Sequence, residues 1–203
     1  DLYIMDADGS NQTQLTEGLH VLFQPSWLPS QGKIVFASQH EGNPNIYTIN
    51  SDGTNLVEIY RSGYDNAFPA WKPDGTKIAF ASHSDASESW NGREIYLMDS
   101  NGSNQVNITN DSSWDGFPSW SPDGSKIAFS SERGGNCEIW VMNSDGSNPV
   151  QLVYGGSNWA PAWSPDGSKI AFVSGADWST GDIYVMDSDG GNIERLTYDG
   201  NYS

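Results

Sequence analysis

The sequence predicts an all-β protein, a β-propeller of four-stranded blades, and three observations lead to this prediction. The stretch WSPDGSKIAF occurs twice, letter for letter, at residues 120–129 and 163–172. A second motif of the type IYVMDSDG follows each copy, and apolar residues come in short bursts separated by Gly, Asp, Asn and Ser without a helical period. A repeat of roughly 40 to 50 residues with four strands has the size of one propeller blade.

The WSPDGSKIAF stretch is typical of a β-hairpin formed by the first two strands of a blade, A and B. Pro presets φ at the first turn position, Asp tolerates the second, and Gly takes the positive φ that follows. Looser copies start at Trp71 (WKPDGTKIAF) and at Trp27 (WLPSQGKIVF). The copy at Trp27 departs most, since Ser30 and Gln31 replace the Pro-Asp pair, but Gly32 still supplies the residue that the turn requires.

The second motif predicts strands C and D, joined by another tight turn. Its four full copies, IYTINSDGTN, IYLMDSNGSN, IWVMNSDGSN and IYVMDSDGGN, start at Ile46, Ile95, Ile139 and Ile183, and strand D ends near Ile59, Ile108, Leu152 and Leu196. Central Asp-Gly or Asn-Gly pairs favour type I′ turns. The same segments resemble calcium loops, but Gly directly follows the second acid and no bidentate Glu comes later, so the spacing does not support a bound calcium ion. We predict no cofactor.

Alternation along strands B and C predicts sheets that are apolar on both faces. In strand B, Ile78 and Phe80 point to one face, and Ala79 and Ala81 point to the other. Strand C alternates in the same way, with Ile95 and Leu97 against Tyr96 and Met98. Because both faces must be covered, large residues of one sheet should meet small residues of the next, as in blades stacked around an axis.

The repeat divides the chain into a single propeller domain, 1–203, with an incomplete ring. Residues 1–16 match only the C–D half of a blade, and residues 198–203 open another linker. Full blades are expected at 17–60, 61–109, 110–153 and 154–197. Strands A and B that would complete the half blade at residues 1–16 are absent from the sequence. We therefore expect either a piece of a longer propeller or closure by another copy, because open blade edges favour self-association.

The motifs PAWSPDGSKIAF and IYVMD and the closing LT resemble the WD-repeat-like repeat, with its PDG motif, of the TolB family. The resemblance covers essentially the whole chain. It implies a bacterial-type, periplasmic or extracellular propeller whose loop face contacts a protein or peptide partner. The motif is more specific for the fold than for a function, since similar blades also occur in propeller domains of peptidases and in lyases.

The charge of the chain narrows the choice of partner. The formal net charge is −17, from 26 acidic and 9 basic residues, which disfavours nucleic acid and anionic membranes and favours a basic partner. No apolar run approaches the roughly 18 residues of a membrane span. The single cysteine, Cys137, excludes an intrachain disulfide framework and a Cys-based zinc site.

The candidate site lies on one face of the predicted propeller. Loops B–C and D–A share this face, which we call the loop face, whereas the A–B and C–D turns lie on the opposite turn face. The predicted ligand-binding residues, all in such loops, are Trp90, Trp114, Trp159, Trp178, Tyr64, Asp65 and Asp115. Aromatic rings beside carboxylates suit peptides with basic or apolar anchors, and also sugars that stack on Trp. The structural alternative is that loop aromatics, Phe68 and Phe117 above all, fill space between blades.

The sequence predicts no catalytic residue. It contains neither a GxSxG nor an HExxH motif. The three histidines, His20, His40 and His83, are scattered, although His40 and His83 occupy equivalent B–C positions and leave a shared site open. We expect a non-catalytic module that binds a protein or peptide. A carbohydrate-binding propeller, or the propeller domain of a larger hydrolase or lyase, are the alternatives.

The motif also ranks the tryptophans by their contribution to stability. Trp120→Ala and Trp163→Ala should each cost about 3 to 5 kcal/mol, because each leaves a cavity between blades. Trp114 is assigned to a loop, so Trp114→Ala should be much milder.

Overall fold

The computed structural model describes residues 1–40, 42–83, 92–176 and 181–198, and these residues form the predicted all-β arrangement. A small sheet contains β1 (Tyr3–Ile4) and β2 (Thr13–Gln14). The first blade contains β3 (Val21–Leu28), β4 (Lys33–Ser38), β5 (Asn45–Asn50) and β6 (Val57–Tyr60), with a 3-10 helix, η1 (Pro29–Gln31), after β3. The second contains β7 (Asn66–Trp71), β8 (Lys77–His83), β9 (Arg93–Asp99) and β10 (Val106–Asn107).

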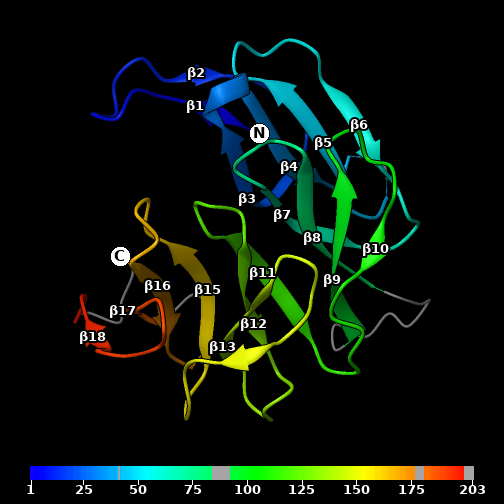
Figure 1. The fold of residues 1–203 in the computed structure, drawn as a ribbon. Coiled ribbons are helices and arrows are strands. Elements are labelled where there is room, and N and C mark those ends of the chain that lie inside the picture. The colour runs from blue at the N-terminus through cyan, green and yellow to red at the C-terminus, as the bar shows by residue number, and fades with distance from the viewer. Residues whose placement is uncertain (41, 84–91, 177–180, 199–203) are drawn as a thin grey trace.

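The third and fourth blades repeat the same order. The third contains β11 (Asp115–Trp120), β12 (Lys126–Ser131), β13 (Glu138–Asn143) and β14 (Val150–Gln151). The fourth contains β15 (Asn158–Trp163), β16 (Lys169–Ser174), β17 (Asp182–Asp187) and β18 (Glu194–Arg195). Each four-stranded sheet is an antiparallel meander in chain order. Figure 1 shows the sheets arranged in an arc, with β1–β2 at one end and β16–β18 at the other.

The A–B turns have the predicted glycine geometry. Gly75, Gly124 and Gly167 have φ of 71°, 67° and 72°. The Asp of the PDG motif has a second function: Asp123 accepts hydrogen bonds from the Ser125 N–H (3.0 Å) and from the Ser121 hydroxyl (2.6 Å). The turn is therefore fixed by backbone preference and by the aspartate side chain together.

The prediction of type I′ turns between strands C and D is wrong. In the first of these turns the Gly9 N–H donates to the Asp6 carbonyl (2.9 Å), so Ala7 and Asp8 are the central residues, and neither has a positive φ. The Asp8 carboxylate instead accepts the Ser10 N–H (2.9 Å), and Gly9 takes the positive φ one position later. The positive φ of Asn11 completes the turn, since its amide donates to the Asp6 carboxylate (2.7 Å).

The blades stack with the predicted pairing of large and small faces. Between the first two blades, β7–β9 contribute large side chains, and β3–β5 contribute a surface with smaller ones. The buried residues of this interface are Trp71, Ile78, Phe80 and Met98 on one side and Leu28, Val35, Ala37 and Ile46 on the other. The next two interfaces repeat these positions, so the hydrophobic core is a series of interblade layers.

Glycines of the C–D turns allow each blade to approach the preceding one closely. A Cβ atom on Gly102 would collide with the carbonyl oxygen of Ile59, and one on Gly146 with that of Ile108. Both carbonyls belong to residues in or next to strand D of the preceding blade. Glycine is therefore required at these two turn positions by the backbone conformation and by the contact between blades.

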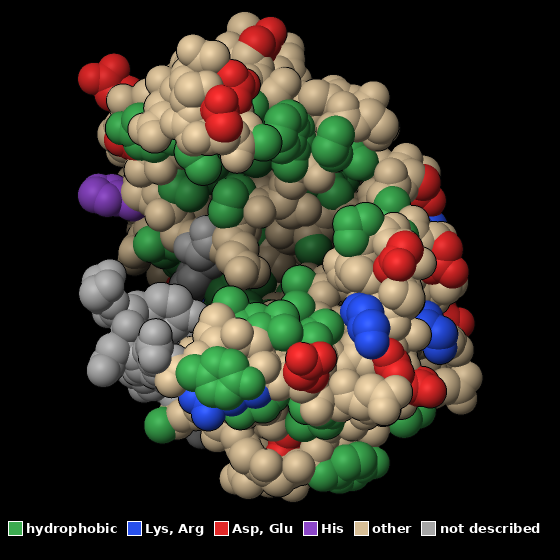
Figure 2. All heavy atoms as spheres, turned by 90° about the vertical axis from the view of Figure 1, so that its left-hand side faces the viewer, with side chains coloured by type: hydrophobic (Ala, Val, Ile, Leu, Met, Phe, Trp, Pro, Cys, Tyr) green, Lys and Arg blue, Asp and Glu red, His purple; other side chains and the backbone are tan. Residues whose placement is uncertain are grey.

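The arc is open on one side. Figure 2 shows this side as a hollow between two parts of the molecule, with hydrophobic side chains on both walls. Trp27 of β3 is 52% exposed, whereas the equivalent Trp71 and Trp120 are 6% and 7% exposed. Within the described ranges, no helix is long and apolar enough to cross a membrane.

Candidate binding face

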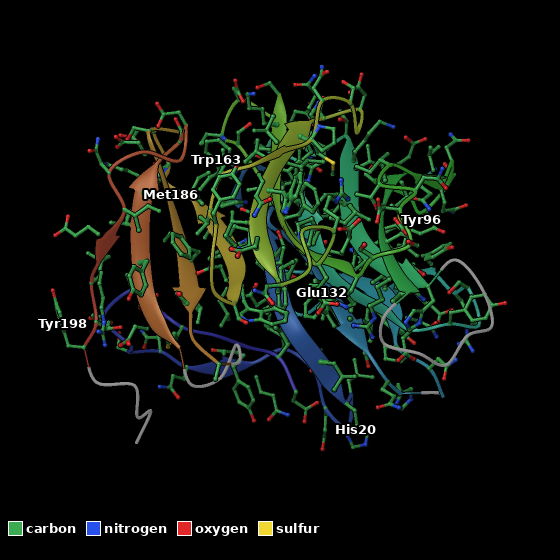
Figure 3. The ribbon with its side chains drawn as sticks, turned by 90° about the horizontal axis from the view of Figure 1, so that it is seen from below. His20, Tyr96, Glu132, Trp163, Met186 and Tyr198 are labelled. Atoms are coloured by element: carbon green, nitrogen blue, oxygen red, sulfur yellow. The ribbon has the colours of Figure 1, made fainter. Side chains whose placement is uncertain are left out.

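Hydrogen bonds between loops confirm that the B–C and D–A connections share one face. The Asn66 N–H donates to the Pro44 carbonyl (3.0 Å), and the Glu132 N–H donates to the Trp114 carbonyl (2.9 Å). In Figure 3, His20 and Tyr198, both in D–A connections, lie toward one end of the sheets, and Trp163 lies toward the other. The loop face and the turn face are therefore distinct surfaces.

An acidic residue at the start of strand C organises the loop face. Glu94 precedes Ile95, and its carboxylate accepts the Thr109 hydroxyl (2.5 Å) and the Asp111 N–H (3.0 and 3.1 Å). The Thr109 hydroxyl in turn accepts the Ile95 N–H (2.9 Å). The closing threonine, which follows Ile108 here and Leu in the LT copies of the motif, thus fastens the end of strand D to the start of strand C and positions the following D–A loop.

The same hydrogen bond between an acid and a threonine occurs in other repeats, and the sequence shows it as a fixed spacing between the two residues. Asp182 accepts the Thr197 hydroxyl (3.2 Å), and Asp1 accepts the Thr16 hydroxyl (3.2 Å). In each pair the acid precedes the threonine by 15 residues, as in the Glu94 pair. In the third blade, which has Val in place of the threonine, Glu138 accepts the Asn158 amide instead (2.6 Å). We did not predict these acids as structural groups, although the fixed separation would have revealed them.

The two predicted site aspartates pair with arginines within the protein. Asp115 is fully buried and lies 2.7 Å from an Arg133 guanidinium nitrogen. Asp65 is partly exposed and lies 3.5 Å from buried Arg93. Burial raises the pKa of Asp115, and Ser131 and Arg133 oppose that shift. Burial also raises the pKa of Glu94. Asp115 therefore stabilises the face from beneath and is not presented at its surface.

Aromatic side chains from three blades form a cluster on this face. The rings of Phe68 and Phe117 lie 4.0 Å apart, and Trp114 lies 5.8 Å from Phe117 and 5.6 Å from Trp159. Trp114 is only 8% exposed, whereas Trp159 is partly exposed. Arg93 lies above the Phe68 ring at 5.9 Å, which connects the cluster to Asp65. We call Phe68, Trp114, Phe117 and Trp159 the aromatic cluster.

A backbone irregularity in strand A makes this cluster possible. Phe68 and Phe117 each precede Pro and have φ of 52°, at a register shift of strand A against strand B. Ala160 occupies the same position in the fourth blade with the same φ. A bulge with an αL residue redirects the side chain out of the regular alternation. The interpretation of Phe68 and Phe117 as residues that fill space between blades agrees with their mutual packing.

The structure brings together only part of the predicted site. Trp114 and Trp159 are in contact, and Asp65 lies near the aromatic cluster through Arg93. Arg133, the partner of Asp115, lies instead over the rings of Phe129 and Trp140, outside the cluster. Tyr64 is half-buried in the linker before β7, where its N–H donates to the Ser62 hydroxyl (3.1 Å). Trp90 and Trp178 lie outside the described residues. A ligand-binding role for these seven residues stays a prediction.

The histidines give no support for a metal centre. His20 and His40 are exposed and His83 is buried. Among the residues that the structure describes, no group of three or more His, Cys, Asp or Glu could hold a metal ion.

The repeat motif, the four stacked blades and the loop face define a protein of the β-propeller class. The family model of the TolB beta propeller domain matches residues 1–160, and the chain belongs to this family. A comparison with curated proteins finds no match.

Solved structures agree with this assignment. TolB from Acinetobacter baumannii is 28% identical and matches with a TM-score of 0.82 over 96% of this chain and 48% of that chain. A putative TolB from Agrobacterium tumefaciens is 24% identical, with a TM-score of 0.79 over 96% of this chain and 79% of that chain. An oligogalacturonate lyase from Vibrio parahaemolyticus, 15% identical, shares only the fold, with a TM-score of 0.66 over 96% of this chain and 59% of that chain. The chain thus spans about half the length of the Acinetobacter protein.

Proposed function

We propose that this chain is a non-catalytic binding module that recognises a basic protein or peptide segment through its loop face. The TolB family resemblance supports a periplasmic or extracellular location and a protein partner. The net charge of −17 supports a basic partner, because opposite charge increases the rate and specificity of association.

The observation that carries the proposal is the aromatic cluster. Its rings are held by neighbours from three blades, so a ligand meets a surface that has little side-chain entropy left to lose. The partly exposed Trp159 supplies an apolar contact at the edge of the cluster. Rigid aromatic anchors of this kind are enriched among the residues that dominate binding energy in protein interfaces.

The acidic groups near the cluster are fewer than the sequence suggested. Asp115 is buried and pairs with Arg133, and Asp65 forms an ion pair with Arg93. Asp111 remains exposed on the D–A loop, and Glu132 is partly exposed after β12. We propose that these two carboxylates attract the basic groups of the ligand, while the ring of Trp159 contacts its apolar part.

Carbohydrate binding receives less support from the geometry than peptide binding. Stacking of a sugar requires an open aromatic face, and Trp114 is buried against Phe117 and Trp159. Of the two indoles in the cluster, Trp159 is the more exposed and is the one that a sugar could stack on. The lyase among the structural neighbours supports the fold alone.

Selection of displayed peptides against the chain, followed by calorimetry, tests the proposal. We expect basic peptides with an aromatic or aliphatic residue, and an affinity that falls between about 0.1 and 1 M salt as the Debye length decreases from about 10 Å to about 3 Å. Trp159→Ala and Asp111→Asn should each weaken binding, whereas Glu194→Gln on exposed β18 is the matched control and should not. Affinity that is independent of salt, or equal for Trp159→Ala and the control, would contradict the proposal. Binding of oligosaccharides but not of peptides would favour the carbohydrate alternative.

A further inference from the structure

One junction between blades has two acids where the other junctions have at least one amide. Two positions of the repeat meet beneath the loop face, one before the Ile of the C-strand motif and one at the start of strand A of the next blade, each opposite the closing Ser of a strand B. In chain order they hold Asn45 and Asn66, Glu94 and Asp115, and Glu138 and Asn158. The junction between the second and third blades is the one with an acid at both positions.

The amides at the other two junctions show that the strand A position provides a hydrogen-bond donor. The Asn158 amide donates to the Glu138 carboxylate (2.6 Å), and the Asn66 amide donates to the Pro44 carbonyl (3.1 Å). Both asparagines and the equivalent Asp115 are buried. A carboxylate has no hydrogen to donate. Asp115 can therefore replace the amide only when it carries a proton.

The hydrogen bonds around Thr109 provide a place for that proton. The Thr109 hydroxyl donates its one hydrogen to Glu94 and accepts the Ile95 N–H with one of its two lone pairs. The same hydroxyl lies beside the Asp115 carboxylate. Asp115 Oδ2 lies 2.7 Å from Arg133, whereas Oδ1 is buried without a hydrogen-bond partner among the described residues. A hydrogen on Oδ1 would bond to the second lone pair of Thr109 and complete a chain from Asp115 to Glu94.

The charges at this junction favour the same proton. Glu94 and Asp115 are 4% and 0% exposed, and Arg133 pairs with Asp115. Two buried carboxylates beside one arginine leave a negative charge without a counterion, and neighbouring buried carboxylates do not readily ionise together. Burial raises the pKa of both side chains, and the Asp115 charge raises the pKa of Glu94 further. One bound proton makes the pair and Arg133 neutral together.

The surroundings do not supply a second cation to the pair. The other charged or titratable groups at this end of the packed strands are His83, Arg93, Tyr96, Asp111, Glu132 and Cys137. Arg93 forms an ion pair with Asp65 on the side of the preceding junction. Asp111 adds a further negative charge and raises the pKa of Glu94. These groups therefore favour retention of the proton.

We propose that Glu94 and Asp115 share one proton in the folded chain, held on Asp115 Oδ1, and that this proton is a pH-sensitive lock between the second and third blades. With the proton bound, Asp115 acts as the donor that Asn158 is at the next junction. Without it, two buried carboxylates repel each other and the junction loosens. Glu94 also accepts the Asp111 N–H, so the D–A loop that contains Trp114 responds to the change. This lock does not depend on whether the loop face binds a peptide.

NMR of the full chain with 13C-labelled aspartate and glutamate tests the proton directly. Asp115→Asn and Glu94→Gln assign the two carboxyl carbons. We expect Asp115 to titrate above the ordinary aspartate value of about 4, and the Glu94 carboxyl and the Asp111 amide to shift with the same midpoint, because the groups form one hydrogen-bonded chain. Titration of Asp115 at or below the ordinary value would overturn the proposal, since the side chain would then be a carboxylate paired with Arg133.

Asp115→Asn tests the lock through stability. Asparagine keeps an oxygen for Arg133 and supplies an N–H group for Thr109, so it imitates the protonated acid. We expect the melting temperature of Asp115→Asn to equal that of the parent near pH 4 and to exceed it increasingly as the pH rises, because the unfolded parent releases a proton that the folded parent retains. A melting temperature below that of the parent at neutral pH is the result of breaking a buried ion pair, and it would overturn the proposal.

Asp182→Asn is the matched control. Asp182 also accepts a threonine hydroxyl, from Thr197, and pairs with Arg195 at 2.5 Å, but it is less buried and is not paired with a second acid. Its melting temperature should not rise above that of the parent with increasing pH. The same rise in Asp182→Asn as in Asp115→Asn would show that the effect comes from general charge, and it would contradict the lock.

The converse variant, Asn158→Asp, places a second acid opposite Glu138. It should create a similar response at the junction between the third and fourth blades, with a melting temperature that falls relative to the parent as the pH rises above about 4. The new Asp carboxyl should titrate above its ordinary value. An Asn158→Asp chain with the pH dependence of the parent, or one that is unfolded even near pH 4, would show that this position does not accept a protonated acid and would overturn the proposal.

Discussion

At the scale of single residues, identical letters of the repeat have different roles according to their neighbours. Trp120 is buried between blades, and its indole N–H donates to the Ala70 carbonyl (3.2 Å), while the equivalent Trp27 is exposed. The sequence predicted both as strand residues, because it contains the motif. It could not predict their burial, since burial depends on which strands the preceding sheet contributes.

Replacement of individual tryptophans by alanine should show how much each one contributes to the free energy of unfolding. We expect Trp120→Ala to lower the free energy of unfolding by about 3 to 5 kcal/mol through cavity formation, and Trp114→Ala to fall in the same range, because Trp114 is as buried as Trp120. This replaces the expectation from sequence that Trp114→Ala is mild. Trp27→Ala is the control and should cost much less. Chemical denaturation measures all three, and a mild effect of Trp114→Ala would show that the aromatic cluster does not contribute to the core.

The aspartates of the PDG turns should make stability depend on pH. Hydrogen bonds from the Ser121 side chain, then from the Ser125 N–H and side chain, lower the pKa of Asp123 from 3.8 to about 2, and Asp166 has the same shift for the same reason. Because their pKa is lower in the folded chain, both groups stabilise it above about pH 4, and this contribution is lost as the pH falls through 2.

Thermal melts of the parent chain and of Asp123→Asn at several pH values measure this effect. The midpoint difference between them should be largest above pH 4 and should shrink toward pH 2, since the protonated aspartate loses the bonds that distinguish it. A difference that stays constant over this range would mean that the carboxylate of Asp123 does not titrate with folding.

At the scale of elements, the motif predicted strands more reliably than turns. Strand B extends over KIAFSS in the third blade, as expected from its apolar letters, and β14 has only two residues. The C–D turns differ from the predicted type because the Asp8 side chain bonds the Ser10 N–H, a local competition that a dipeptide preference does not include. The acids at the start of strand C were missed for a related reason, because their partners lie 15 residues away.

Two glycines at the same turn position provide a test of how blades fit together. Gly9 and Gly102 have nearly equal φ, 85° and 86°, but a Cβ atom on Gly9 would meet nothing within 4 Å, whereas one on Gly102 would collide with the Ile59 carbonyl. Gly9→Ala should therefore cost about 1 kcal/mol, for its positive φ alone. Gly102→Ala should cost about 1 to 3 kcal/mol more, because the adjacent blade must shift. Equal losses in denaturation would show that close approach between blades is not what selects glycine here.

At the scale of the whole molecule, stability should vary along the arc. Each sheet packs only on its neighbours in the chain, so the molecule resembles a linear array in which interior units have two interfaces and end units have one. Ala79 and Ala128, on strand B of the second and third blades, are fully buried, but the equivalent Ala171 of the fourth blade is partly exposed. The loop-face aromatic cluster extends from the second blade to the fourth, so through Trp159 it also includes the end blade.

Hydrogen exchange measured by mass spectrometry should reveal this gradient. We expect the strongest protection in β8 and β12, weaker protection in β16, and the fastest exchange in β1 and β2, because local opening requires less free energy where fewer apolar contacts are lost. Uniform protection across the five sheets that the structure describes would instead mean that the arc unfolds as a single cooperative unit, in which the loss of one interface between blades is coupled to the loss of all.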